Sequence, residues 1–319
     1  MNDLGFFEYL QLVIFYVSWL YFPAAVVLAW IIARRARRQK IIAALALAAL
    51  SVLAYARFVE PSILLTVDHD IRLKRCFAEA GAFRLAVVSD MHIGLFPNTT
   101  PVARIAARLK AIAPDAALIA GDFDYFLAPS RFAKTYAPLG AIGAPVYAVL
   151  GNHDVGMSGP DVGAPLTAAL EADGVDMIDN KHAEITLNGA GIELVGLAEL
   201  WQGREDLSLV AEPSPMPRIV LAHHPEAIYG LPAGDARPDL LVAGHTHGGQ
   251  VWLPGLTCFL AKLACLVTRY GEKDVGRTEV FVTSGTGMVD LPLRFLAAPR
   301  IDVLHVAYDA CDSAGQSPK

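Results

Sequence analysis

The chain has few charged residues, few cysteines and no internal repeat or long low-complexity tract. Charged residues make up 18% of its 319 residues. The four cysteines (Cys76, Cys258, Cys265 and Cys311) lack the close pairs typical of zinc sites, which argues against a cysteine-ligated metal. Buried or free thiols are therefore expected, although the seven-residue spacing of Cys258 and Cys265 could place both on one helical face.

A basic surface is also missing from most of the chain. The whole chain carries a formal charge of −6, and residues 1–60 contain six cations and three acids, so the remainder is near −9. Proteins that bind nucleic acid neutralise its phosphates with a broad basic footprint. Nucleic acid is therefore not expected as a partner.

The front of the chain is predicted to be a membrane anchor over residues 1–60. Residues 9–33 contain no charged side chain, and about 20 apolar residues cross a hydrocarbon core of about 30 Å as a helix. The basic segment 34–40 follows, and then a shorter alanine-rich apolar stretch, residues 41–56. A transmembrane helical hairpin is the preferred interpretation, and a single span is the alternative.

The charge bias across this anchor predicts its orientation. Five cations lie in residues 34–40, and the N-terminus carries Asp3 and Glu8 but no Lys or Arg. Because basic loops stay in the cytoplasm, a multi-pass protein of a bacterial inner membrane with its large domain in the periplasm is expected, although cations just after the second span oppose this. A cleaved export signal ending at Ala54-Tyr55-Ala56 is an alternative that also exports the domain.

Beyond a connector (61–81), residues 82–308 are predicted to form an α/β domain, with a loose tail at 309–319. Short apolar runs bounded by Gly and Pro indicate strands buried on both faces, and helical patterns such as residues 102–112 alternate with them. The runs are residues 84–89, 116–120, 146–150, 218–222 and 239–243.

A polar cluster follows each of these runs. Open α/β sheets keep their sites at the carboxyl ends of the strands, so the clusters should meet. Carboxylate, amide and imidazole groups together suit borderline divalent metals. The clusters are Asp90-Met91-His92, Gly121-Asp122, Gly151-Asn152-His153-Asp154, His223-His224 and Gly244-His245-Thr246-His247-Gly248-Gly249; the Gly-rich turn 283–287 carries no ligand type.

The ordered set resembles the calcineurin-like metallophosphoesterases, and its last motif, residues 244–250, resembles the membrane-associated bacterial branch that reads GHTHGGQ. The resemblance covers residues from about 82 to about 308. It implies a four-layer α/β/β/α sandwich with two mixed sheets. It also implies a metal-dependent phosphoric ester hydrolase that uses two divalent ions, with manganese, zinc and iron all compatible.

The resemblance assigns a role to each matching residue. The first metal would be held by Asp90, His92 and His247. The second would be held by Asn152, His223 and His245, with Asp122 bridging the two ions. His153 would be the catalytic histidine and not a ligand. Two such ions can clamp the attacking and leaving oxygens of a displacement, and a nearby histidine can protonate the leaving oxygen.

Three more residues receive weaker assignments. Asp154 is expected to orient a ligand imidazole or, equally, to cap the loop after its strand. Many relatives place an acid three residues after the bridging aspartate, whereas Asp124 comes one position early. If Asp124 points away from the pocket, His153 lacks its usual partner. His224 is expected to line the pocket or to point into solvent.

The leading functional hypothesis is a membrane-anchored hydrolase of a phosphate mono- or diester, on a phosphorylated small molecule or a lipid headgroup. A pyrophosphatase acting on a UDP-diacylglucosamine-type lipid precursor is the enzymatic alternative, and it would face the cytosol. A metal-stabilised scaffold without catalysis is a third, which the intact ligand set opposes. The apolar segment 253–267 is expected to be a helix packed on the sheet or a lip that touches acyl chains or the membrane interface. The sequence leaves the oligomeric state open.

Overall fold

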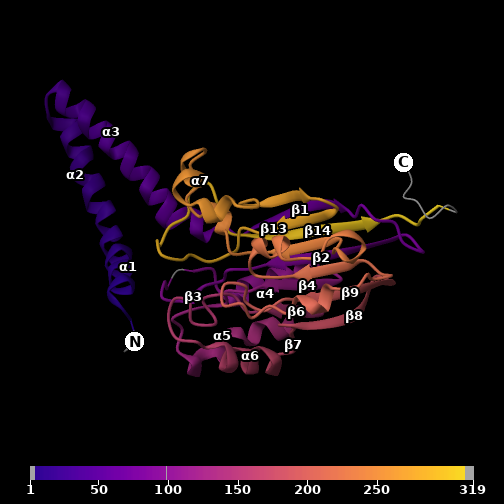
Figure 1. Cartoon of the computed structure of the whole chain (residues 1–319). Helices are drawn as coiled ribbons and strands as arrows, with labels where there is room; N and C mark the ends of the chain where they lie inside the picture. Colours follow the sequence, from indigo (N-terminus) through magenta and orange to yellow (C-terminus); the bar gives the residue numbers. More distant parts are fainter. Residues whose placement is uncertain (1–3, 98, 313–319) are drawn as a thin grey trace.

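The computed structural model describes residues 4–97 and 99–312 and consists of a helical hairpin beside a layered domain (Figure 1). The first arm runs through α1 (Phe6–Val17), a 3-10 turn (Ser18–Leu20) and α2 (Tyr21–Arg34). The second arm, α3 (Arg37–Ala54), packs against α2 and continues through π and 3-10 turns to Ser62. Phe6–Arg34 and Arg37–Ser62 are long and apolar enough to cross a membrane by length and composition.

The first sheet has six strands, and only its β14–β2 pair is antiparallel. Three helices cover its outer face: α4 (Val102–Ile112), α5 (Phe132–Tyr136) and α6 (Gly163–Ala172). Its edge strand β1 comes from residues 61–81, which the sequence left as a connector. The order is β1 (Leu65–Arg72), β14 (Arg300–Tyr308), β2 (Gly81–Val88), β4 (Ala116–Ala120), β6 (Val146–Val149) and β7 (Val175–Met177).

The second sheet also has six strands, antiparallel only at its two edges. Its order is β12 (Gly271–Val275), β13 (Thr278–Val282), β11 (Leu240–Ala243), β10 (Arg218–Leu221), β9 (Ala190–Gly196) and β8 (Lys181–Leu187). A minor two-stranded sheet pairs β3 (Ile93–Gly94) with β5 (Asp124–Tyr125).

Three apolar cores hold the layers together. One fills the space between the helices and the first sheet, and a second lies between the two sheets. The third lies on the outer face of the second sheet, beneath the 3-10 helices Leu207–Val210 and Pro225–Tyr229. The expected α/β/β/α architecture with two mixed sheets is confirmed, and the fourth layer is made of these short 3-10 helices.

All four cysteines are paired, so the expectation of buried or free thiols was wrong. Cys76 bonds Cys311 and Cys258 bonds Cys265. The first pair forms because β1 and β14 run parallel, so the residues that follow them also run side by side, as the Phe77–Ala310 bridge shows. The first disulfide holds the start of the predicted loose tail, whose residues 313–319 lie outside the described part of the chain.

Candidate metal centre

The residues expected to bind metal all follow strands that end at one edge of the sandwich. The first sheet supplies the loops after β2, β4 and β6, and the second supplies the loops after β10 and β11. Because the two sheets pack face to face, loops from both meet over the shared edge. In strand order they carry Asp90 and His92, Asp122, Asn152, His223, and His245 and His247.

The backbone at these positions is unusual. Five of these side chains sit on residues with positive φ: Asp90 (49°), His92 (43°), Asp122 (55°), His245 (68°) and His247 (54°). Each such conformation costs about 1–3 kcal/mol and persists where the surrounding structure imposes it, which is common at functional sites. The loop after β6 also packs closely against Asp122. At Gly151 an added Cβ would lie 2.1 Å from Asp122 Oδ1, so only glycine fits there. The sharp turns aim all five side chains inward.

A first group of donors gathers around His92. Its Nε2 lies 3.0 Å from His247 Nε2, and His247 Nε2 lies 3.4 Å from Asp90 Oδ1. Asp90 Oδ1 is buried and has no hydrogen-bond partner among the described residues. An unpaired carboxylate oxygen and two facing imidazole nitrogens are unfavourable as they stand. A cation among the three would satisfy all of them, so this group fits a metal.

A second group gathers around His223. Its Nδ1 donates a hydrogen bond to the Ala120 carbonyl at 2.7 Å. This leaves Nε2 as the ring nitrogen that can bind a metal ion. That Nε2 lies 3.0 Å from Asn152 Oδ1 and 3.2 Å from His245 Nδ1. One amide oxygen and two imidazoles again make a set suited to a borderline metal.

Asp122 joins the two groups. Its Oδ2 lies 3.2 Å from His223 Nε2 and 3.4 Å from His92 Nε2. Burial opposes the charge on Asp122, but the neighbouring histidines, His223 foremost, hold its pKa well below the usual range. A single carboxylate oxygen therefore faces both groups and carries negative charge between them.

The electrostatics of the histidines also favour metal binding. Burial lowers the pKa of His92 to about 3 and moves the pKa values of His245 and His247 well below the usual range. These imidazoles are neutral, as metal ligands must be. His223 differs, because the charge and hydrogen bond of Asp122 outweigh burial and raise its pKa to about 10. Its proton compensates Asp122, and a metal ion would replace that proton.

His153 lies beside both groups with a free side chain. Its backbone N–H donates to Asp122 Oδ1 at 2.9 Å, while its ring packs edge-on against His92 and Tyr125. The Nδ1 atom is buried and has no partner in the described chain. Distance alone would also allow a metal group of His92, Asp122 and His153. The ring is therefore placed by packing rather than by a side-chain hydrogen bond.

Neither nearby aspartate orients a histidine. Asp124 accepts hydrogen bonds from the backbone N–H groups of Phe126 and Leu127, and so closes its own turn. Asp154 accepts from the backbone of residues 123, 124 and 151, which corresponds to the loop-capping interpretation. The expectation that Asp154 orients an imidazole was wrong, because backbone donors occupy both its oxygens. Among the described residues, no acidic side chain is hydrogen-bonded to the His153 ring.

His224 is buried and held by an acid that the sequence analysis missed. Its Nε2 lies 2.7 Å from Glu199, so the expectation of a solvent-facing or pocket-lining ring was wrong. Glu199 and Trp201 follow β9, and Trp201 packs against His224 and His245. Both residues lie shortly after the end of β9. No motif marks them.

A second missed residue is Arg294, whose guanidinium is fully buried. It donates to the carbonyls of Ser284 and Ala297, and one Nη atom lies 3.4 Å from His247 Nδ1. Its backbone N–H donates to the carbonyl of Ala56, at the end of the second arm of the hairpin. Burial lowers the pKa of this guanidinium to about 10, so it stays charged at neutral pH. Arg294 thus connects the loops that carry the candidate metal ligands to the hairpin.

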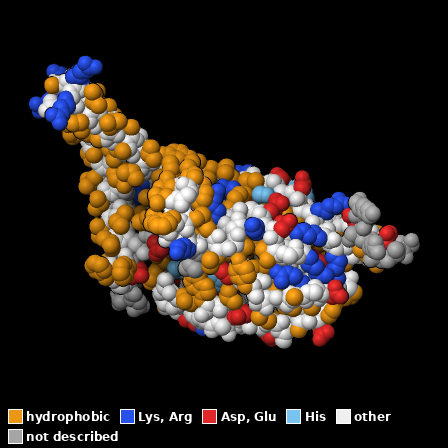
Figure 2. Space-filling model, turned by 45° about the horizontal axis from the view of Figure 1, so that its top comes forward, with side chains coloured by type: hydrophobic (Ala, Val, Ile, Leu, Met, Phe, Trp, Pro, Cys, Tyr) orange, Lys and Arg blue, Asp and Glu red, His pale blue; other side chains and the backbone are white. Residues whose placement is uncertain are grey.

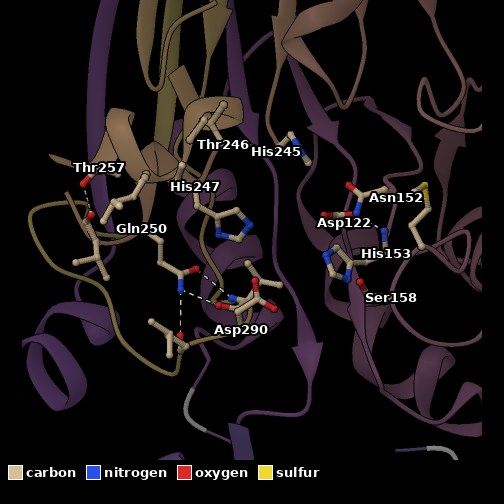
Figure 3. A pocket seen from close by; sticks show the side chains of 18 of the residues that line it. Asp122, Asn152, His153, Ser158, His245, Thr246, His247, Gln250, Thr257 and Asp290 are labelled. Carbon is tan, nitrogen blue, oxygen red and sulfur yellow. Dashed lines mark hydrogen bonds between the residues drawn. The ribbon is translucent and has the colours of Figure 1, made fainter. Parts of the chain in front are cut away.

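The site opens into a pocket of about 630 Å³. Figure 3 shows His247, Gln250 and Asp290 on one side of the pocket and Asp122, Asn152 and His153 on the other. Polar groups occupy its floor. The apolar part of its lining is made of Val251, Leu253, Leu256, Leu260, Ala261, Ala264, Val289 and Leu291.

Most of this apolar lining belongs to the segment around α7 (Leu256–Leu260), which the Cys258–Cys265 disulfide closes into a loop. Phe259 and Leu260 are each 71% exposed, so the expectation of a helix packed on the sheet was wrong. The segment forms a lip beside the pocket instead. In Figure 2 apolar side chains continue from the hairpin onto the domain, and Lys and Arg gather at the far tip of the hairpin.

Comparison with known proteins shows the family of this chain. The model of the calcineurin-like phosphoesterase family matches residues 83–249. The chain belongs to this family. An uncharacterized metallophosphoesterase of Bacillus subtilis, YkuE, is 29% identical over 78% of this chain and 87% of its own. Escherichia coli phosphodiesterase YaeI is 28% identical over 79% of this chain and 92% of its own.

A more distant relative carries a lipid-related name. The UDP-2,3-diacylglucosamine pyrophosphatase LpxG of Chlamydia muridarum is 24% identical over 63% of this chain and 74% of its own. The predicted hydrolase class is therefore confirmed: the chain is a metal-dependent phosphoesterase with a cluster of candidate metal-binding residues.

Proposed function

We propose that this phosphoesterase uses two divalent metal ions to hydrolyse a membrane-borne phosphoric ester at the outer face of a bacterial inner membrane. Asp90, His92 and His247 would hold one ion. Asn152, His223 and His245 would hold the other. The observation that carries the proposal is the position of Asp122 Oδ2, within 3.4 Å of a histidine from each group.

The metals and the protein have separate tasks in this proposal. When bound, two divalent ions stabilise charge on the phosphoryl oxygens and lower the pKa of water. His153 has no side-chain hydrogen bond among the described residues and borders the pocket, so its ring is available to donate a proton to the leaving oxygen. Alkoxides leave poorly unless protonated. His153 is therefore the proposed general acid.

The pocket supports a substrate with an apolar part. Its metal-facing floor is polar, whereas Leu253, Leu256 and Leu260 contribute to its apolar lining. The exposed lip beside that lining continues the apolar surface of the hairpin (Figure 2). A headgroup phosphate could reach the metals while an acyl or prenyl chain stays on the lip. A phosphodiester or phosphomonoester lipid fits this arrangement better than a free nucleotide.

Two observations support an external domain. Disulfides persist in oxidising compartments and are rare in the cytosol, and this chain has two. The five cations of residues 34–40 lie at the hairpin tip, where a cytoplasmic position is favoured. The cytosolic pyrophosphatase remains the second candidate because of the similarity to LpxG. Both observations oppose it.

A turnover screen of the full-length, detergent-solubilised protein with added Mn²⁺ tests the proposal. The panel contains phosphomonoesters, phosphodiesters, phospholipids and nucleotide-linked lipids, each also with the Asp122→Asn variant. Hydrolysis of lipid esters in preference to their short-chain analogues is expected. Turnover of the nucleotide-lipid alone, together with a cytosolic C-terminal reporter fusion, would favour the pyrophosphatase.

The lip provides an internal control. Replacing Phe259, which is exposed on the lip and does not line the pocket, by Ser should raise KM for long-chain esters in mixed micelles and leave kcat/KM for a soluble nitrophenyl ester unchanged. The soluble ester reports on the metal centre in the same protein sample. Equal losses on both substrates would contradict a lipid-contacting lip.

A further inference from the structure

One polar side chain of the first helix contacts two residues beside the candidate active site. Gln11 lies in α1, whose sequence is otherwise apolar apart from Glu8 near its start. An amide in an apolar helix is unfavourable unless both its ends find partners. Gln11 Oε1 accepts a hydrogen bond from the Tyr125 hydroxyl at 2.8 Å, and its Nε2 lies 3.4 Å from Asp290 Oδ1. Both partners belong to the phosphoesterase domain.

This contact is part of a packed interface rather than a single bond. Phe15 of α1 is buried and stacks on Phe96 at a ring separation of 5.9 Å. The same cluster contains Tyr125 and Met288 of the domain, with Leu12 of α1 packed against it. Most other apolar side chains of α1 are exposed, so this face alone is fixed to the domain.

Tyr125 in turn touches the proposed catalytic histidine. Its ring packs edge-on against His153 at 5.2 Å and against His92 at 5.5 Å. Its hydroxyl is the donor in the bond to Gln11, so the polar end of the ring is held by α1. Its backbone lies in β5, directly after Asp124, whose carboxylate closes the local turn. The His153 ring therefore depends on neighbouring rings for its orientation.

We infer that Gln11 is a positioning residue for His153 and acts through Tyr125. The hydrogen bond from the anchor fixes the Tyr125 ring, and that ring limits the angles available to the His153 imidazole. The anchor thereby supplies the restraint that Asp124 does not. The inference rests on the proposed function, since it assumes that His153 acts on the leaving oxygen.

The test uses the full chain in detergent with Mn²⁺ and compares Gln11→Met, Tyr125→Phe and the double variant. Leu10→Met, on the exposed side of the same helix, is the matched control. Each single variant should lower kcat for an alkyl phosphodiester about tenfold with little change in KM, within the roughly 10²-fold that a 1 Å misplacement can cost. The loss should be smaller on a nitrophenyl ester. The double variant should be no slower than the worse single variant, because both changes remove the same bond.

A second measurement needs neither metal nor turnover. Hydrogen–deuterium exchange of residues 123–127 should quicken in metal-free Gln11→Met and stay as in the parent protein in Leu10→Met. Full kcat in Gln11→Met, or a double variant whose loss is the product of the two single losses, would overturn the inference. Failure of the proposed function would give other kinetic results: the parent protein would be inactive, or the His153→Ala variant would be fully active. Either result would remove the catalytic role of Gln11, while the exchange data would still report the contact.

Discussion

Replacing His153 by Ala should separate catalysis from metal binding. The His153 side chain makes no hydrogen bond to the described residues, and its backbone N–H, which donates to Asp122 Oδ1, is retained in alanine. No buried partner loses its hydrogen bond, so the free energy of unfolding should change by no more than about 1 kcal/mol. Both metal ions should remain bound.

The loss of rate should be large. General acid–base catalysis contributes about 10²–10⁴-fold, which corresponds to about 3–5 kcal/mol of transition-state stabilisation. The full loss is expected for an ethyl or glyceryl phosphodiester, whose alkoxide needs a proton to leave. A nitrophenyl ester, whose phenolate leaves unaided, should lose much less.

The assay measures kcat and KM for both esters beside metal content by elemental analysis. His182→Ala is the matched control, because that side chain is half exposed on β8, away from the pocket residues. Equal fractional losses on the two esters would exclude leaving-group protonation and leave stabilisation of phosphoryl charge as the role of His153. Loss of a metal ion would make His153 a ligand, as its grouping with His92 and Asp122 permits, and would refute the assignment.

Three further outcomes are expected. Asp122→Asn should lower metal content and abolish hydrolysis together; two ions with full activity in that variant would contradict the bridging role. Neutralising the arginines of residues 34–40 should weaken or invert the orientation, measured by labelling of a C-terminal tag in intact cells. The pKa of His69 is raised because its hydrogen bond to Asp302 and nearby acids outweigh burial. Its stabilisation should be complete below about pH 6.5 and lost as the pH rises through the raised pKa; His69→Gln should remove that slope in urea unfolding.

The gathering of the proposed ligands at one edge of the sandwich could be predicted because it follows from local rules. An apolar run of four to six residues marks a buried strand, and the polar residue directly after it, such as Asp90 or His223, lies at the carboxyl edge of its sheet. These rules do not say which donor binds which metal ion. The proposed assignment comes from the family resemblance. Local rules also place Glu199 at this edge, after β9, but a lone acid beside no other cluster carried no signal.

The remaining features depend on contacts between distant parts of the chain. Cys76 and Cys311 are 235 residues apart and meet only because β1 and β14 pair in parallel. Positive φ angles occur at five of the proposed ligands; Asp and His adopt this conformation more often than most residues, but it is uncommon for any residue except glycine, so the residue type alone does not predict it. Neither the pairing of two edge strands nor the strain of a packed loop is encoded in a short window of sequence.

The position of Asp124, one residue earlier than the acid in many relatives, can be understood only from the sequence and the structure together. From the sequence it indicates only that an acid sits one position early, with His153 left uncertain. In the structure that acid closes the turn that carries Tyr125, and Tyr125 faces His153 on one side and Gln11 of the anchor on the other. A one-residue shift therefore coincides with a contact from the N-terminal helix α1. An enzyme organised in this way would depend on its anchor for activity as well as for location.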